Sequence, residues 1–114
     1  MAFYMIQVSY NTDGWKGLLA SPQDRIEAIK PALEQLDGKV VSGWLSFGEY
    51  DVVAIVDLPT NVSAAAFSMA VSAGGTVDGF KTTPLMGMDE AVTAMELAAE
   101  SAYVPASAKD TVTA

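Results

Sequence analysis

The sequence predicts an α+β protein with the ferredoxin-like order β-α-β-β-α-β, followed by one further helix. Two observations support this class. Segments of strand length alternate with amphipathic segments of helical length. The strands that such a sheet places at its centre, 3–10 and 51–57, are also the two richest in apolar residues. With 114 residues the chain has room for one domain, expected over 1–102, and a flexible tail is expected over 103–114.

The first strand, 3–10, presents two different faces. One face is expected to pack against a helix and consists of Tyr4, Ile6, Val8 and Tyr10. The other face is more polar than an ordinary core face and consists of Met5, Gln7 and Ser9.

Two helical segments are predicted before the second strand. A short one covers 14–19, with Asp13 as its N-cap. The longer one is capped by Ser21, ahead of a proline and an acidic residue in the first turn. Its buried stripe recurs at helical spacing and consists of Ile26, Ile29, Leu33 and Leu36. Pro31 is expected to kink this helix because proline lacks an amide donor, and Gly38 is expected to end it in the left-handed conformation.

The second and third strands are predicted over 39–47 and 51–57, joined by a tight corner at 48–51. Gly48 can take a positive φ there, and Asp51 can accept hydrogen bonds from nearby backbone amides. The third strand is apolar at every position from Val52 to Val56 instead of alternating. Both of its faces must therefore be covered.

The second half of the chain continues the pattern. A helix of small residues is predicted over 62–73, capped by Thr60 or Asn61. The fourth strand, 76–85, contains glycine and proline, which suits an edge strand. A last helix is predicted over 90–102.

Two helices can cover only one face of such a sheet. The other face carries apolar side chains of the third strand, and an exposed patch of that kind is more often an interface than a free surface. The simplest cover is the same sheet of a second copy, which gives a two-fold dimer with a barrel-like sandwich. We therefore expect a homodimer or a larger homo-oligomer.

The composition excludes several classes of chemistry. The chain has no Cys and no His, which removes thiolate chemistry, the commonest general base at neutral pH and the commonest metal ligand. Fourteen acidic and six basic residues give a net charge of −8, which argues against binding nucleic acid. No apolar run is long enough to span a membrane. We expect a cytoplasmic protein with no metal and no cofactor.

Several short motifs are spread along the chain: Ile6-Gln7-Val8-Ser9-Tyr10, Gly14-Trp15-Lys16-Gly17-Leu18, Phe47-Gly48-Glu49-Tyr50-Asp51-Val52-Val53, Asp57-Leu58-Pro59, Asn61-Val62-Ser63-Ala64-Ala65 and Lys81-Thr82-Thr83-Pro84-Leu85. Together they resemble the GYD-domain family, small bacterial and archaeal proteins related to the dimeric α/β-barrel group. The similarity extends to about Glu100. It implies the ferredoxin-like fold and dimerisation, and it carries no catalytic residue set.

Two local motifs are candidate sites. The corner Glu49-Tyr50-Asp51 could bind a cation or supply an acid/base pair, or its acids could be solvated turn residues with Asp51 capping the hairpin. Trp15 and Lys16 could form a lid that suits a small anionic or aromatic ligand. Alternatively, Trp15 packs over the end of the core and Lys16 lies in solvent.

A third candidate is dispersed along the sequence. If Gln7 and Ser9 lie on the open side of the sheet, neighbouring strands add Trp44, Lys81, Ser42 and Ser46. Apolar walls with a few convergent polar groups are typical of a small-molecule pocket. The alternative is that these polar groups satisfy one another across a dimer interface anchored by Trp44.

Three functions remain open from the sequence. The first is a small-molecule-binding or partner-binding oligomer that acts as a sensor or accessory subunit. The second is a cofactor-independent isomerase, decarboxylase or oxygenase, with Tyr50, Asp51, Lys16 or Lys81 moving protons. The third is an architectural protein whose surfaces build an assembly.

Overall fold

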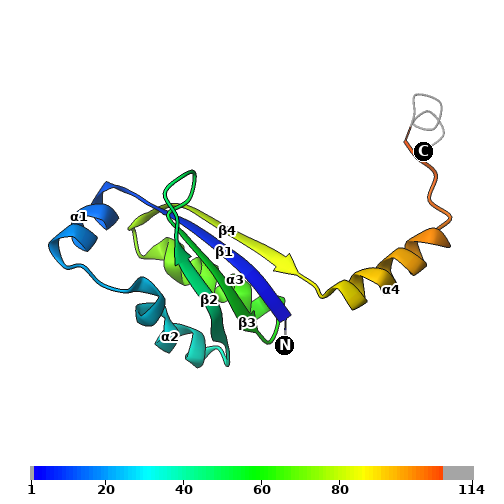
Figure 1. Cartoon of the computed structure of the whole chain (residues 1–114), viewed down its shortest axis with the longest axis horizontal. Helices are drawn as coiled ribbons and strands as arrows, with labels where there is room; N and C mark the ends of the chain where they lie inside the picture. Colours follow the sequence, from blue (N-terminus) through cyan, green and yellow to red (C-terminus); the bar gives the residue numbers. More distant parts are fainter. Residues whose placement is uncertain (1, 107–114) are drawn as a thin grey trace.

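The computed structural model describes residues 2–106 and contains a four-stranded antiparallel sheet with four helices (Figure 1). Along the chain the elements are β1 (Ala2–Tyr10), α1 (Thr12–Ala20), α2 (Arg25–Gln35), β2 (Lys39–Leu45), β3 (Val52–Leu58), α3 (Asn61–Ala73), β4 (Val77–Leu85) and α4 (Met88–Ala99). The strand order is β2-β3-β1-β4, so β1 and β3 are central and β4 is an edge strand, as predicted. The ferredoxin-like α+β class is confirmed.

The core lies between one face of the sheet and helices α2 and α3. It consists of Tyr4, Ile6 and Val8 of β1, Ala54, Val56 and Leu58 of β3, Leu33 of α2, and Ala64 and Phe67 of α3. The predicted stripe of α2 is confirmed, because Ile26, Ile29 and Leu36 pack against this cluster around the fully buried Leu33. Helix α2 also continues through Pro31 to Gln35.

Two of the predicted helix caps are wrong. Helix α1 is capped by Asn11, whose side chain accepts a hydrogen bond from the Gly14 amide, and Asp13 lies within its first turn. Helix α2 is capped by Asp24, whose side chain accepts from the Ile26 and Glu27 amides, so Ser21 lies outside the helix. In both cases several residue types suited to capping stand close together in the sequence. The cap of α3 is Thr60, one of the two residues predicted.

The turns also differ in detail from the predictions. Strand β2 ends at Leu45 and the connection to β3 covers 46–51, so the predicted four-residue corner is wrong. Gly48 does not adopt a positive φ. After α2 the left-handed residue is Asp37, with φ 58°, and not Gly38. Gly38 is required for a different reason: a Cβ there would lie 2.8 Å from the Asp57 carbonyl oxygen.

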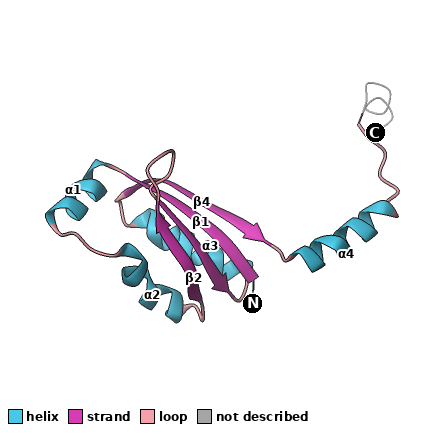
Figure 2. Ribbon diagram, in the orientation of Figure 1, coloured by secondary structure: helices cyan, strands magenta, loops and turns pink. Residues whose placement is uncertain are grey.

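Helix α4 extends away from the sheet beyond the end of β4 (Figure 2). None of its residues is buried, and the described chain is elongated, with extents of 59 × 31 × 23 Å. It begins two residues before the predicted start and ends three before the predicted end, and 101–106 form no helix or strand. The rest of the predicted tail lies outside the described residues. No helix in residues 2–106 has the length and apolarity needed to cross a membrane.

Two glycines of α1 should respond in opposite ways to alanine. At Gly14 a Cβ would collide with the Thr76 carbonyl oxygen and lie 3.1 Å from Tyr10 Cβ. Overpacking of this kind should lower the free energy of unfolding of Gly14→Ala by about 1–3 kcal/mol, measured by urea denaturation. Gly17→Ala, in the same helix, meets nothing within 4 Å and should gain up to about 1 kcal/mol from helix propensity. Equal effects would contradict this docking of α1.

Candidate functional site

Four of the predicted site residues lie on the sheet face opposite the helices, called the open face from here on. Trp44, Val53, Gln7 and Lys81 are direct neighbours in one row across all four strands. Ser9 lies on the same side, two residues further along β1. Ser42, Ile55, Met5 and Thr83 form the adjacent row. Trp44 is 67% exposed, so the open face presents apolar surface to solvent in the single chain.

The Glu49-Tyr50-Asp51 corner is built into the structure of the sheet. The Asp51 amide donates to the Val8 carbonyl oxygen at 2.7 Å, and Asp51 Oδ2 accepts from the Tyr10 amide at 2.9 Å. The Ser46 hydroxyl donates to the Tyr50 carbonyl oxygen at 2.6 Å. Asp51 therefore has a structural role, but it binds the amide of a β1 residue and not an amide of its own hairpin, and Glu49 is exposed.

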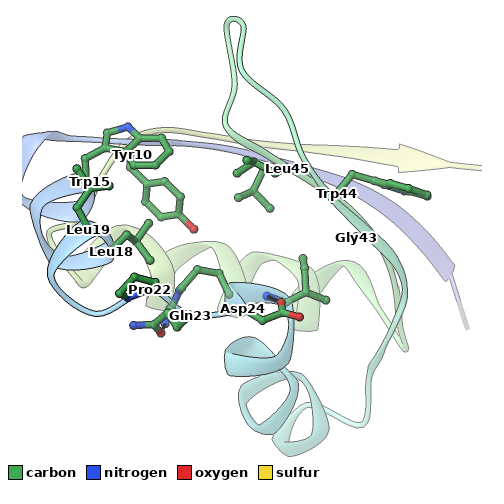
Figure 3. Close-up of a pocket in the computed structure, with 13 residues that line it drawn as sticks. Tyr10, Trp15, Leu18, Leu19, Pro22, Gln23, Asp24, Gly43, Trp44 and Leu45 are labelled. Carbon is green, nitrogen blue, oxygen red and sulfur yellow. Dashed lines mark hydrogen bonds between the residues drawn. The ribbon is translucent and has the colours of Figure 1, made fainter.

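A cleft lies on the helix side of the sheet, between α1, the start of α2, and strands β2 and β3 (Figure 3). This cleft has a volume of about 540 Å³. It is lined by Tyr10, Trp15, Leu18, Leu19, Pro22, Gln23, Asp24, Arg25, Ile26, Gly43, Trp44, Leu45 and Val52. Most of these side chains are apolar. The volume falls within the range of about 300–1,000 Å³ that is usual for ligand pockets.

Tyr10 lies at the end of β1, and its hydroxyl points into the cleft (Figure 3). The Trp15 ring packs edge-on against the Tyr10 ring, with 5.5 Å between ring centroids and 76° between planes. Burial raises the pKa of the Tyr10 phenol, the nearby Arg25 guanidinium acts in the opposite direction, and the Asp51 carboxylate adds a smaller increase. At neutral pH this phenol is therefore protonated and can donate a hydrogen bond.

Arg25, the only arginine in the sequence, is the first residue of α2 and is half-buried. Its Nη1 donates to Gln23 Oε1 at 2.7 Å, which leaves further guanidinium donors for another acceptor. The neighbouring Asp24 carboxylate accepts from the Ile26 and Glu27 amides at 2.9 and 3.2 Å. Arg25 is thus the cation of the cleft, and the adjacent acid is engaged in capping the helix.

A second hollow of about 70 Å³ continues from the cleft toward the core. It shares Tyr10, Arg25, Ile26 and Val52 with the cleft and reaches Phe67 and Phe80. Those two rings meet edge to face, with 6.2 Å between their centroids. The apolar space therefore extends between the sheet and the helices.

The structure does not bring the eight predicted residues into one site. Gln7, Ser9, Trp44 and Lys81 share the open face, Tyr50 and Asp51 lie in the β2–β3 loop, and Trp15 lines the cleft while Lys16 is exposed on α1. Trp44 also borders the cleft, but its ring points away from it (Figure 3). The residues named as alternatives for moving protons, Tyr50, Asp51, Lys16 and Lys81, are thus distributed over the β2–β3 loop, α1 and the open face, and none of them lines the cleft.

Sequence reasoning missed Tyr10 and Arg25 as site residues. Tyr10 was assigned to the helix-facing side of β1, which is where it lies, but not to a cavity. Arg25 carried one available signal: it is the single arginine, placed directly after a capping residue at the start of an amphipathic helix. Within the described residues no group of three or more Asp and Glu side chains is close enough to hold a metal ion.

Comparison with protein families gives a match to the GYD domain over residues 4–95. Comparison with curated proteins and with solved structures gives no match. The matched segment begins in β1 and ends within α4, so it includes all of the sheet from Tyr4 onward and every residue that lines the cleft. The chain belongs to the GYD domain family.

Proposed function

We propose that this protein binds a small molecule with an apolar body and one anionic group in the cleft, and that it works as a homo-oligomer, at least a dimer, in which a second copy covers the open face. Such a protein would act as a sensor or an accessory subunit. The observation that carries the ligand proposal is the pairing of the Arg25 guanidinium with the protonated Tyr10 phenol in a cleft of otherwise mostly apolar walls.

The chemistry of the cleft limits the class of ligand. Leu18, Leu19, Ile26, Leu45 and Val52 offer surface that favours an apolar body. The rings of Tyr10 and Trp15 offer edges and faces to an aromatic group. Guanidinium and phenol are both hydrogen-bond donors at neutral pH, so they suit an acceptor such as a carboxylate. An aromatic or aliphatic carboxylate satisfies all three conditions.

The proposed dimer is supported by the exposure of the open face. Trp44 and Phe3 are 67% and 46% exposed there, and Met5, Val53 and Ile55 lie between them. These side chains lie on the central strands β1 and β3 and on the edge strand β2, and together they form an apolar area that contacts water in a single chain. Apolar area of this extent is usual for an interface and uncommon for a free surface.

Ligand binding can be tested with two probes of the same shape. 2-Naphthoate should bind the wild-type protein more tightly than the uncharged naphthalene-2-carboxamide, measured by isothermal titration calorimetry. Arg25→Gln should weaken naphthoate binding by about tenfold or more, because a charge-assisted hydrogen bond contributes about 1.5–3 kcal/mol, and should leave carboxamide binding unchanged.

The matched control for this experiment is Lys30→Gln. Lys30 is a second cation on α2, and its Nζ lies 2.8 Å from Glu27 Oε1 on the outer surface. This substitution should leave the affinity for naphthoate unchanged. Equal losses in the two variants would mean that the net charge of the protein, and not the Arg25 site, determines binding, and would contradict the proposal.

Dimerisation can be tested on the full chain by native mass spectrometry at micromolar concentration, where the wild-type protein should be dimeric or larger. Trp44→Asp places a charge on the open face and should shift the protein to monomer, since a buried tryptophan anchor often contributes about 2 kcal/mol or more. Met69→Asp, on α3, changes a side chain of similar exposure, 70%, and should have no effect. A monomeric wild-type protein would refute the dimer.

A further inference from the structure

We propose that helix α4 is an arm that docks on the open face of a second copy of this chain, and that two copies exchange their arms reciprocally. The inference rests on the proposed dimer and goes further, because it names the element that covers the face: the helix of the partner in place of the sheet of the partner.

The first support is that α4 has no packing of its own. Met88, Val92 and Met95 are 74%, 49% and 61% exposed, and none of the helix is buried. The described chain has a radius of gyration of 18.7 Å, whereas a compact domain of this length would have about 13 Å. A lone helix of 12 residues is only marginally stable in water, because helix nucleation is costly. A packing partner is needed to hold α4 in place.

The second support is the pattern of side chains around α4. Met88, Val92, Met95 and Ala99 follow one another at intervals of four, three and four residues and form a single apolar stripe. The acidic residues flank this stripe or face away from it, and they are Asp89, Glu90, Glu96 and Glu100. Leu97 is nine residues, or two and a half turns, after Met88 and therefore lies on the opposite side. The helix has one face suited to burial, and it carries only negative charge.

The third support is that the open face complements this pattern. Its centre is apolar, around Met5, Val53 and Ile55, and its two edge strands each contribute a lysine, Lys39 on β2 and Lys81 on β4. Lys39 stands directly opposite Asp57 of β3 in the register, whereas Lys81 is in the row of Gln7, Val53 and Trp44, which contains no acid. An acidic amphipathic helix matches an apolar surface with a basic edge.

The dimensions of the two surfaces also agree. Twelve residues of α-helix are about 18 Å long, at 1.5 Å per residue. Four strands spaced about 4.8 Å apart place the two edge strands about 14 Å from each other. The arm can thus reach from one edge strand to the other.

The short connection between β4 and α4 favours docking of the arm on a second copy over docking on its own sheet. Only Met86 and Gly87 separate the strand from the helix, and the Ala91 amide donates to the Gly87 carbonyl oxygen at 3.0 Å. In this conformation the helix points away from its own sheet (Figure 1). Docking on its own open face would require the chain to reverse direction at these two residues. Docking on a second copy requires no change in the conformation of this connection.

The absence of native cysteine makes this contact testable by cross-linking in the full chain. One tagged chain carries Met95→Cys and a differently tagged chain carries Ile55→Cys. The two are unfolded together, refolded and treated with a short bismaleimide. We expect cross-linked pairs that contain both tags. Leu97→Cys replaces Met95→Cys as the matched control, on the other side of the arm, and should give at least about tenfold less product.

A chain that carries both Met95→Cys and Ile55→Cys distinguishes the two destinations of the arm. The proposal predicts cross-linked dimers, whereas a fast-migrating cross-linked monomer would show that the arm folds back on its own sheet and would overturn it. Sedimentation equilibrium gives an independent readout: Met95→Asp should weaken dimerisation about 30-fold, and Leu97→Asp should not.

The failures of the two proposals are separable. If the wild-type protein is a dimer that Trp44→Asp dissociates, but Met95→Asp leaves intact and no arm-to-face product forms, the exchanged arm is wrong and the dimer through the open face stands. If the wild-type protein is a monomer, the dimer and the arm fail together.

Discussion

The fold depends on one constraint: the central strand β3 is apolar on both faces from Val52 to Val56, and the helices of the chain cover only one face of the sheet. On the covered side, Tyr4, Ile6 and Val8 of β1 meet α2 and α3, and this contact forms the core. On the other side, Val53, Ile55 and Met5 remain in contact with solvent. The two helices cannot cover the apolar side chains on the second face of β3, and this exposed area is the basis of the proposed dimer.

The cleft lies beside α1, at the end of the sheet where the side covered by helices is not completely filled. Helix α1 is fastened beside the end of the sheet: the Asn11 amide donates to the Thr76 carbonyl oxygen at 3.0 Å, and Asn11 Nδ2 donates to the Gly75 carbonyl oxygen at 2.7 Å. The link from α1 to α2 then passes the ends of β2 and β3 without filling the space above them. Leu45, paired with Val52 on the helix side, is left 66% exposed. The hollow is therefore a gap between two helices and a sheet end, with Tyr10 at its wall.

Side-chain periodicity predicted core residues correctly in elements that bury one face. The alternation in β1 identified Tyr4, Ile6 and Val8 as core, and the spacing in α2 identified Leu33. Prediction failed where neighbouring residues compete for one backbone role, as with Asn11 against Asp13 or Asp37 against Gly38. The sequence did not identify Arg25 as a site residue. Arg25 lines the cleft because α2 approaches the end of β1, and no local sequence pattern encodes that approach. Local energetics select elements, and tertiary contacts create sites.

A β-bulge in β2 determines which of its side chains point to the cleft and which point to the open face. Val40 pairs with Val56 and Ser42 pairs with Ile55, so one extra residue is inserted at Val41 and the side-chain alternation changes phase. Gly43 then turns toward Ile26, and Leu45 toward the cleft, while the Trp44 ring lies on the open face. The same few residues thus form a wall of the cleft and the anchor of the open face.

This shared strand has a consequence for how the two proposed sites communicate. A ligand that contacts Leu45 and the Gly43 backbone acts on the segment that positions Trp44, and a partner that packs on Trp44 acts on the same segment from the other side. Any difference in ligand affinity between monomer and dimer must then appear as an equal difference in dimer affinity between the free and liganded protein, because coupling between two binding equilibria is reciprocal. In a protein that acts as a sensor, β2 is the element that would carry the signal.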